Sequence, residues 1–195
     1  MDGRRPVICD DGSVEKSDLE TSLQAPVLET ERLRLRGHRA EDFADCAKLW
    51  GDPIVTRFFG GTPKSSEDAW ARLLRYAGHW NILGFGYWVV EEKASGRYLG
   101  EVGFADYKRI MEPSIAGTPE VGWVFMPEVH GKGFAIEAGL AIHAWGRLHF
   151  KGPRTACIIN PENARSLRLA EKLGYRETLR TTYRNAPTVL MHREW

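Results

Sequence analysis

The chain of 195 residues is long enough for one domain with a substantial core, and its 43% hydrophobic content is typical of a globular protein. The 27 lysines and arginines nearly balance the 26 acidic residues, so a net charge of +1 gives no support for a nucleic-acid or anionic-membrane partner. No apolar run approaches the about 20 residues of a membrane span, and the three dispersed cysteines include no Cys-x-x-Cys pair. We therefore expect a cytoplasmic protein without a metal site.

The first 25 residues are polar and lack periodicity, which predicts a flexible N-terminal tail (1–25) ahead of a single domain (26–195). In that domain, alternating and helical spacings of apolar residues follow one another in a regular order. They predict a strand at 32–36, a helix at 40–49, a helix from a Ser66 cap to about residue 80, and a hairpin of strands at 87–91 and 98–106. A long loop at 107–119 follows.

A glycine-rich turn then joins a strand at 120–126 to a long helix that begins near Gly133. The turn, Val129-His130-Gly131-Lys132-Gly133-Phe134-Ala135, has the Gly-x-Gly spacing that gathers main-chain N–H groups at a helix start, where an anion binds. It is not a P-loop, because Lys132 is followed by glycine rather than by Ser or Thr. It is not a dinucleotide fingerprint, because Ile136 stands where a third glycine is required. The turn therefore predicts a phosphate site of another kind.

A second strand–helix unit follows directly. Residues 155–159 form a short β-branched strand that Pro161 ends. Asn163 is a favourable N-cap for a helix that stops at Gly174. Strands at 175–184 and 188–193 complete the chain. Two such units in series place a ligand between the carboxyl ends of their strands.

Three motifs together resemble the GNAT superfamily of N-acetyltransferases. The run from His130 to Ala135 is similar to its acetyl-CoA pyrophosphate loop, Gln/Arg-x-x-Gly-x-Gly/Ala. Residues 160–166 and 171–175 resemble its segment Asn-x-x-Asn-x-x-Ser…Glu-Lys-Leu-Gly-Phe/Tyr. The opening strand, 27–36, is similar to that of the RimJ/RimL-type branch, which acetylates N-termini of ribosomal proteins. The resemblance covers about residues 26 to 195.

The resemblance implies a single α/β domain, with a mixed, twisted sheet of six to seven strands and helices on both faces. It implies direct transfer of an acetyl group from acetyl-CoA to a primary amine, either a protein N-terminus or a small molecule, with no covalent acyl-enzyme. The alternative is a non-catalytic acyl-CoA-binding sensor or interaction module. The sequence leaves open whether the terminal strands pair two copies into a homodimer.

The resemblance also assigns the cofactor contacts. A pantetheine arm would run along the strand as an added partial strand, and the pyrophosphate would meet main-chain N–H groups of the turn. His130 departs from the usual Gln or Arg, which puts its side-chain contact in question but not the main-chain cradle. The assigned residues are Val124, Phe125, Met126, His130, Gly131, Lys132, Gly133, Phe134, Ala135, Asn160 and Asn163.

Two residues are assigned to the chemistry. Glu120 is the first candidate for the general base, because strand alternation places it on one face with Gly122, whose missing side chain leaves room for substrate. The alternative reading is a surface or salt-bridged carboxylate, and Glu101 in the neighbouring strand is a weaker candidate base. Related enzymes protonate the leaving thiolate with a tyrosine, but Ala170 stands at that position. Ser166, one turn earlier, is the expected substitute, against the alternative of a helix-surface serine.

Overall fold

The computed structural model describes residues 24–195, so the expected tail lies outside the described residues apart from its last two positions. These residues form one eight-stranded sheet in the order β1-β2-β3-β4-β5-β6-β8-β7. All neighbouring strands are antiparallel except β5 and β6. The strands are β1 (Leu28–Glu29), β2 (Leu33–Arg36), β3 (Tyr87–Glu92), β4 (Tyr98–Ala105), β5 (Glu120–Phe125), β6 (Arg154–Ile159), β7 (Arg176–Tyr183) and β8 (Ala186–Glu194).

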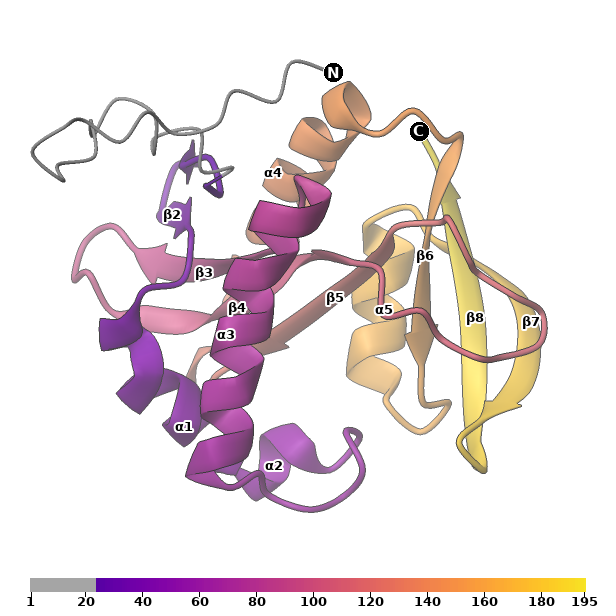
Figure 1. Cartoon of the computed structure of the whole chain (residues 1–195), viewed down its shortest axis with the longest axis horizontal. Helices are drawn as coiled ribbons and strands as arrows, with labels where there is room; N and C mark the ends of the chain where they lie inside the picture. The colour runs from indigo at the N-terminus through magenta and orange to yellow at the C-terminus, as the bar shows by residue number, and fades with distance from the viewer. Residues whose placement is uncertain (1–23) are drawn as a thin grey trace, which may run out of the picture.

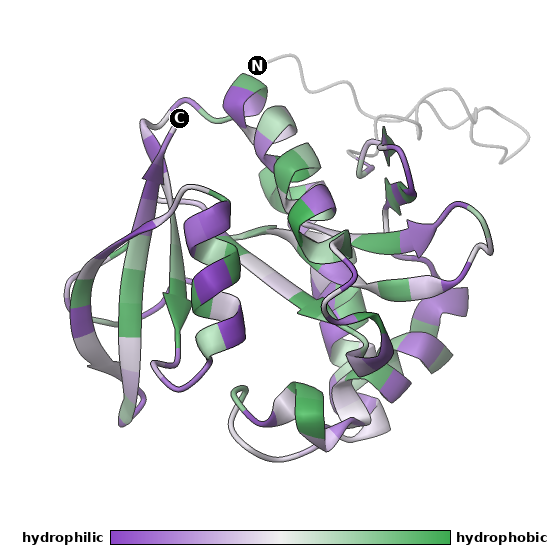
Figure 2. Cartoon of the chain, turned by 180° about the vertical axis from the view of Figure 1, so that it is seen from behind, coloured by the Kyte–Doolittle hydropathy of each residue, from purple (hydrophilic) through white to green (hydrophobic). Residues whose placement is uncertain are grey.

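Helices cover both faces of this sheet. Figures 1 and 2 show α1 and α3 on one face and α4 and α5 on the other. The green positions of Figure 2 mark the apolar residues of α4 and of the central strands, which pack together. The helices are α1 (Phe43–Gly51), α2 (Pro53–Thr56), α3 (Ser66–Leu83), α4 (Phe134–His149) and α5 (Ala164–Lys172), with short 3-10 turns η2 (Ala40–Asp42) and η3 (Pro127–Val129). No helix of the described part is long and apolar enough to cross a membrane.

Helix α4 lies close to its neighbours because two of its residues have no side chain. A Cβ atom on Gly139 would come within 2.7 Å of Leu173 at the end of α5. One on Gly146 would come within 2.7 Å of the Trp195 ring. These contacts hold the middle of α4 beside the end of α5, and the last turn of α4 beside the C-terminal residue of the chain.

The predicted fold class is confirmed: a mixed sheet with helices on both faces. Each of the seven predicted strands is present, and the eighth is β1, a two-residue edge strand too short for a periodic pattern. The expected cap of the second helix is displaced by one residue. Ser65, not Ser66, accepts the hydrogen bond from the main chain of Asp68, whose side chain in turn binds the main chain of Ser65. Asn163 caps α5 as predicted, and Gly174 ends it with φ of 91°.

Candidate active site

The glycine turn forms an anion-binding helix start. Gly131 and Gly133 both have positive φ, 78° and 84°, and Gly133 is the N-cap of α4, where no side chain caps the helix. A Cβ on Gly131 would meet no atom within 4 Å, so the space before the turn is open. The Lys132 N–H is the exception to the predicted cradle, because it donates to the Val129 carbonyl at 3.4 Å. The turn therefore fits a diphosphate at Gly131, Gly133 and the first residues of α4.

The sheet splits next to this turn. Strands β5 and β6 pair at one position alone, Glu120 opposite Ala156, and Figure 1 shows them diverging beyond it. Main-chain groups alternate in direction along a strand. The Met126 N–H donates to Leu99 on β4, and the Val124 carbonyl also faces β4. Of the three residues expected to line the pantetheine arm, Phe125 alone thus turns its main-chain groups into the split; Val124 and Met126 do not.

The side chain of His130 closes one end of the split. Its Nε2 lies 3.0 Å from the Phe125 carbonyl oxygen, and its Nδ1 lies 3.2 Å from Nη1 of Arg165 on α5. Because a carbonyl accepts and a guanidinium donates, Nε2 carries the proton and Nδ1 accepts. His130 thus bridges β5 and α5, and its contact with the cofactor stays a prediction.

The first turn of α5 places Ser166 beside Trp123 of β5. The side chain of Asn163 accepts from the Ser166 N–H at 3.2 Å, and Asn160 accepts from the Glu162 N–H at 2.9 Å. The Trp123 indole N–H donates to Ser166 Oγ at 3.3 Å. Since the indole occupies one acceptor site of the hydroxyl, Ser166 keeps its own proton to donate.

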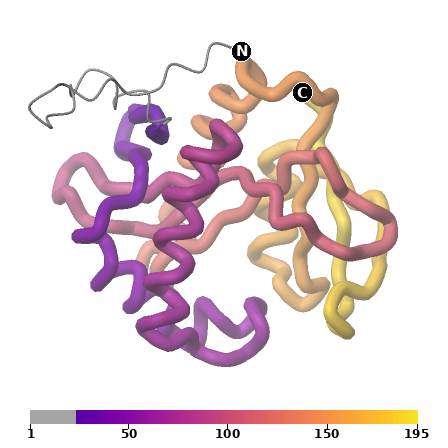
Figure 3. The backbone as a smooth tube through the Cα atoms, viewed as in Figure 1, coloured from indigo at the N-terminus to yellow at the C-terminus, as the bar shows by residue number. Residues whose placement is uncertain are grey.

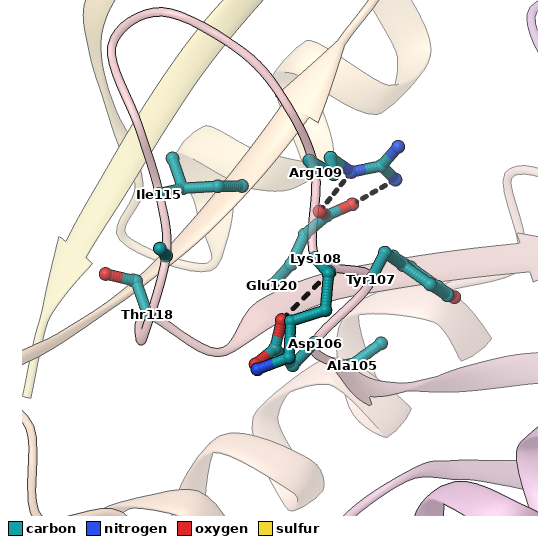
Figure 4. A pocket seen from close by; sticks show the side chains of 9 residues that line it. Ala105, Asp106, Tyr107, Lys108, Arg109, Ile115, Thr118 and Glu120 are labelled. Atoms are coloured by element: carbon teal, nitrogen blue, oxygen red, sulfur yellow. Dashed lines mark hydrogen bonds and ion pairs between the residues drawn. The ribbon is translucent and has the colours of Figure 1, made fainter.

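Glu120 is a buried, ion-paired carboxylate. Its two oxygens accept from Arg109 Nε at 2.5 Å and Nη2 at 2.6 Å, as the dashed lines in Figure 4 mark. The guanidinium carbon lies 4.9 Å from the ring centre of Tyr107 and 5.0 Å from that of Tyr183. Burial lowers the pKa of Arg109, but its hydrogen bonds to Glu120 outweigh burial and raise it overall. Glu120 thus has the salt-bridged form that the sequence left open, in a pocket lined by Asp106, Tyr107, Arg109, Ile115, Thr118 and Glu120.

The space expected beside Gly122 is filled. A Cβ on Gly122 would lie 1.9 Å from the hydroxyl oxygen of Tyr87 on β3. The glycine therefore accommodates a buried tyrosine of the protein, and the expectation of room for substrate at this position is wrong. The pocket opens instead beside the loop that carries Arg109, which runs past β8 and β7 in Figure 3. Thr181 on β7 donates to the Glu112 carbonyl of this loop at 2.7 Å.

Glu101, the weaker candidate base, is fully buried on β4. It accepts from the Trp50 indole at 3.0 Å and from the Tyr98 hydroxyl at 2.8 Å, and His38 Nε2 lies 3.4 Å away. Burial raises the pKa of this carboxyl, but these partners outweigh burial, and the pKa is lowered overall. Glu101 is held in place on every side by protein, so we assign it no catalytic role.

The described cysteines are not reactive groups. Cys46 and Cys157 are buried and unpaired, and burial raises the pKa of both thiols. A thiol nucleophile needs a lowered pKa. Within residues 24–195, no three His, Cys, Asp or Glu side chains gather as a metal site.

A mixed sheet splits after one bridge, beside an uncapped glycine turn at a helix start, and this geometry fits an extended anionic ligand. The family model described as "Acetyltransferase (GNAT) domain" matches residues 32–176, and the chain belongs to this family.

Similar proteins agree with this assignment. The chain is 30% identical over 162 residues to the uncharacterized protein YkkB of Bacillus subtilis (strain 168), covering 78% of this chain and 88% of the relative. It is 30% identical over 147 residues to the uncharacterized N-acetyltransferase YnaD of the same organism, covering 75% and 81%. A solved structure assigned to the GnaT family of acetyltransferases, from Bordetella pertussis, is 28% identical, with a TM-score of 0.76 over 87% of this chain and 99% of that one. The protein is an acetyltransferase.

Sequence reasoning missed Arg109, Tyr107 and Tyr183. Arg109 and Tyr107 lie in the loop expected at 107–119, which has no periodic pattern, and Tyr183 ends β7. A positive charge in the loop before β5 could have indicated a partner for Glu120. The sequence offers both Lys108 and Arg109 there and does not distinguish them.

Proposed function

We propose that the protein is an acetyl-CoA-dependent N-acetyltransferase of the RimJ/RimL-type branch, which transfers acetyl directly to a primary amine. The observation that carries the proposal is the split between β5 and β6, which pair at a single position next to the uncapped start of α4. The split offers strand edge to an extended chain, and the helix start offers N–H groups to phosphates. The buried, high-pKa cysteines support direct attack over an acyl-enzyme.

Acetyl-CoA, when bound, supplies an activated acetyl carbonyl and a thiolate leaving group. The main-chain N–H groups of Gly131, Gly133 and Phe134 would hold its diphosphate. The main-chain groups of Trp123 and Phe125 would hold its pantetheine arm at the split. Asn163 keeps its amide N–H groups for the same ligand, since its side-chain oxygen is used by the Ser166 N–H.

Glu120 is proposed to take the proton that an ammonium must lose before its nitrogen can attack. Arg109 contacts both carboxylate oxygens and thereby fixes the orientation of Glu120. Each carboxylate oxygen can accept two hydrogen bonds and accepts one from Arg109, so one lone pair per oxygen is left for an ammonium N–H. The proton then moves from the amine nitrogen to a carboxylate oxygen of Glu120.

Ser166 is proposed to protonate the departing thiolate from Oγ, and Oγ takes a proton back from solvent as the thiol leaves. Its hydroxyl accepts from the Trp123 indole and has its own proton to give. The tyrosine position of related enzymes is held here by Ala170, which is fully buried and has no side-chain proton to donate.

The acceptor is proposed to be a protein N-terminus or a small-molecule amine. A solved spermidine N-acetyltransferase from Vibrio cholerae, in complex with CoA and spermine, has a TM-score of 0.66 to this chain but is 20% identical, so the likeness concerns the fold alone. A second candidate function is a non-catalytic acyl-CoA-binding module. It is favoured by one observation: Arg109 already contacts both oxygens of Glu120.

One experiment separates these functions. Release of free thiol from acetyl-CoA is measured against a panel of N-terminal peptides and small amines, and CoA affinity is measured by calorimetry. For Glu120→Gln, we expect turnover to fall by about 100-fold or more with CoA affinity within about twofold, because proton transfer contributes on that order. Glu177→Gln, in an exposed ion pair on β7, is the matched control and should leave both unchanged.

Tight CoA binding without turnover on any amine would establish the module instead. Turnover that survives Glu120→Gln undiminished would remove Glu120 from the chemistry. Ser166→Ala should lower kcat while leaving the KM for acetyl-CoA near its wild-type value, because its role begins as the thiolate departs.

A further inference from the structure

The opening motif of the domain, which the proposed chemistry does not use, lies against the phosphate turn. Thr30 Oγ1 donates to Glu137 Oε1 at 2.6 Å, and the Arg32 main-chain N–H donates to the same oxygen at 2.9 Å. Arg32 Nε and Nη2 lie 2.7 Å and 2.6 Å from Glu137 Oε2. Glu137 belongs to the first turn of α4. The start of β2 is therefore fastened to the helix that begins at the turn.

The Arg32 guanidinium also contacts the turn itself. Its Nη1 donates to the Lys132 carbonyl at 3.1 Å, and its carbon lies 4.6 Å from the centre of the Phe134 ring. Between these two contacts, Nη2 would be 3.2 Å from a Cβ on Gly133. The guanidinium thus spans the N-cap residue, touching the residue before it and the residue after it.

This arrangement differs from an ordinary surface ion pair, and the neighbouring pair shows how. Arg34 and Glu29 make a single 2.8 Å contact, and their side chains are 56% and 43% exposed. The Glu137 side chain is 17% exposed and accepts from two donors besides the Arg32 guanidinium: the Thr30 hydroxyl and the Arg32 main-chain N–H. Burial raises the pKa of Glu137, but these hydrogen bonds outweigh it and lower the pKa overall, so the carboxylate stays charged.

A charged carboxylate in the first turn of α4 stabilises the helix but repels a phosphate bound at the same helix end. Arg32 offsets that charge, and its hydrogen bond holds the Lys132 carbonyl oxygen in place. Both effects favour an anion at the N–H groups of the turn.

We propose that Arg32, fixed by Glu137 and Thr30, is a positioning residue that holds the phosphate turn in its anion-binding conformation and thereby sets the affinity for the diphosphate of coenzyme A. The inference rests on the proposed function. It assigns a role to the Thr30-Glu31-Arg32 motif that lies about one hundred positions before the turn.

The test compares Arg32→Gln with Arg34→Gln, its matched neighbour on β2. Calorimetry with CoA should show Kd about tenfold higher for Arg32→Gln, from the loss of charge-assisted hydrogen bonds, and unchanged for Arg34→Gln. Ligand-observed NMR with pantetheine, which lacks the diphosphate, should show equal affinity in both variants and the wild type. Arg32→Lys keeps the charge but loses the simultaneous contact with Glu137 and the Lys132 carbonyl, so its CoA affinity should lie between those of the wild type and Arg32→Gln. It replaces Arg32→Gln in the test if that variant does not fold.

Unchanged CoA affinity in Arg32→Gln, or equal losses for CoA and pantetheine, would overturn the positioning role. If the wild type and Arg32→Gln both bind CoA tightly, this inference is refuted and the proposed function stands. A wild-type protein that does not bind CoA overturns the proposed function, and the role of Arg32 with it.

Discussion

A buried histidine in α4 leads to a prediction about how stability depends on pH. His143 is 2% exposed, and its Nδ1 lies 2.6 Å from the Gly139 carbonyl, so Nδ1 carries the proton. Its Nε2 therefore accepts from the Tyr175 hydroxyl at 2.8 Å, and that hydroxyl accepts from Thr155 at 2.7 Å. A neutral imidazole therefore satisfies both of its nitrogens in this row of hydrogen bonds from Gly139 to Thr155. Burial lowers the pKa of His143 from 6.5 to about 4.

The sign and size of the effect follow from this pKa. Above pH 6.5 the histidine is neutral in both the folded and the unfolded chain, and its full contribution to stability is present. As the pH falls from 6.5 toward 4, the unfolded chain binds a proton that the folded chain does not, so the free energy of unfolding decreases. At about 1.4 kcal/mol per pH unit, the loss from this residue is roughly 2 kcal/mol at pH 5 and approaches ~3 kcal/mol near pH 4.

Urea unfolding at pH 7.5 and pH 5.0 measures this loss. We expect the wild type to lose about 2 kcal/mol more than His143→Gln between these two values, because the variant has no such group to protonate. Carboxylates titrate equally in both proteins, so the comparison removes their contribution. His149→Gln, which replaces an exposed histidine of the same helix, should behave as the wild type does. Equal pH dependence in the wild type and His143→Gln would refute the reasoning.

Two further substitutions test the packing around the candidate site. Gly122→Ala places a Cβ 1.9 Å from the Tyr87 hydroxyl oxygen and should lower the free energy of unfolding by about 1 to 3 kcal/mol. Adding Tyr87→Phe removes that oxygen and should restore part of the lost stability in urea unfolding. A double variant no more stable than Gly122→Ala would contradict the assigned contact. Glu101→Gln removes the buried charge that accepts from Trp50 and Tyr98 and should cost about 3 kcal/mol in urea unfolding, with CoA affinity of the folded protein unchanged. A variant as stable as the wild type would show that this carboxylate is not ionised.

Local patterns in the sequence predicted most of the fold. The cap at Asn163 and the stop at Gly174 are confirmed, because caps depend on a few consecutive residues. The glycine turn and its helix are confirmed for the same reason, since positive φ at Gly131 and Gly133 is a requirement that glycine meets locally. The two-residue strand β1 was missed, because its partner on β2, rather than its own pattern, makes it a strand.

The candidate site could be predicted only in part. The sequence located Glu120, Ser166 and the turn, and their catalytic and binding roles stay predictions. It could not show that Tyr87 fills the place beside Gly122, because the register between β3, β4 and β5 decides that contact. It could not show that His130 reaches the Phe125 carbonyl, because that contact depends on the direction of main-chain groups at the split.

The sequence by itself therefore determined the elements, their order and the family, since periodicity, capping and turn residues act over a few positions. Tertiary structure alone decided which charges meet: Arg109 with Glu120 across a loop, and Arg32 with Glu137 between β2 and α4. An ion pair forms wherever the fold brings two side chains within a few ångströms of each other, and the chain carries many charged residues of each sign. The number of pairings that the sequence allows is large, and packing of the sheet against its helices selects the few that exist.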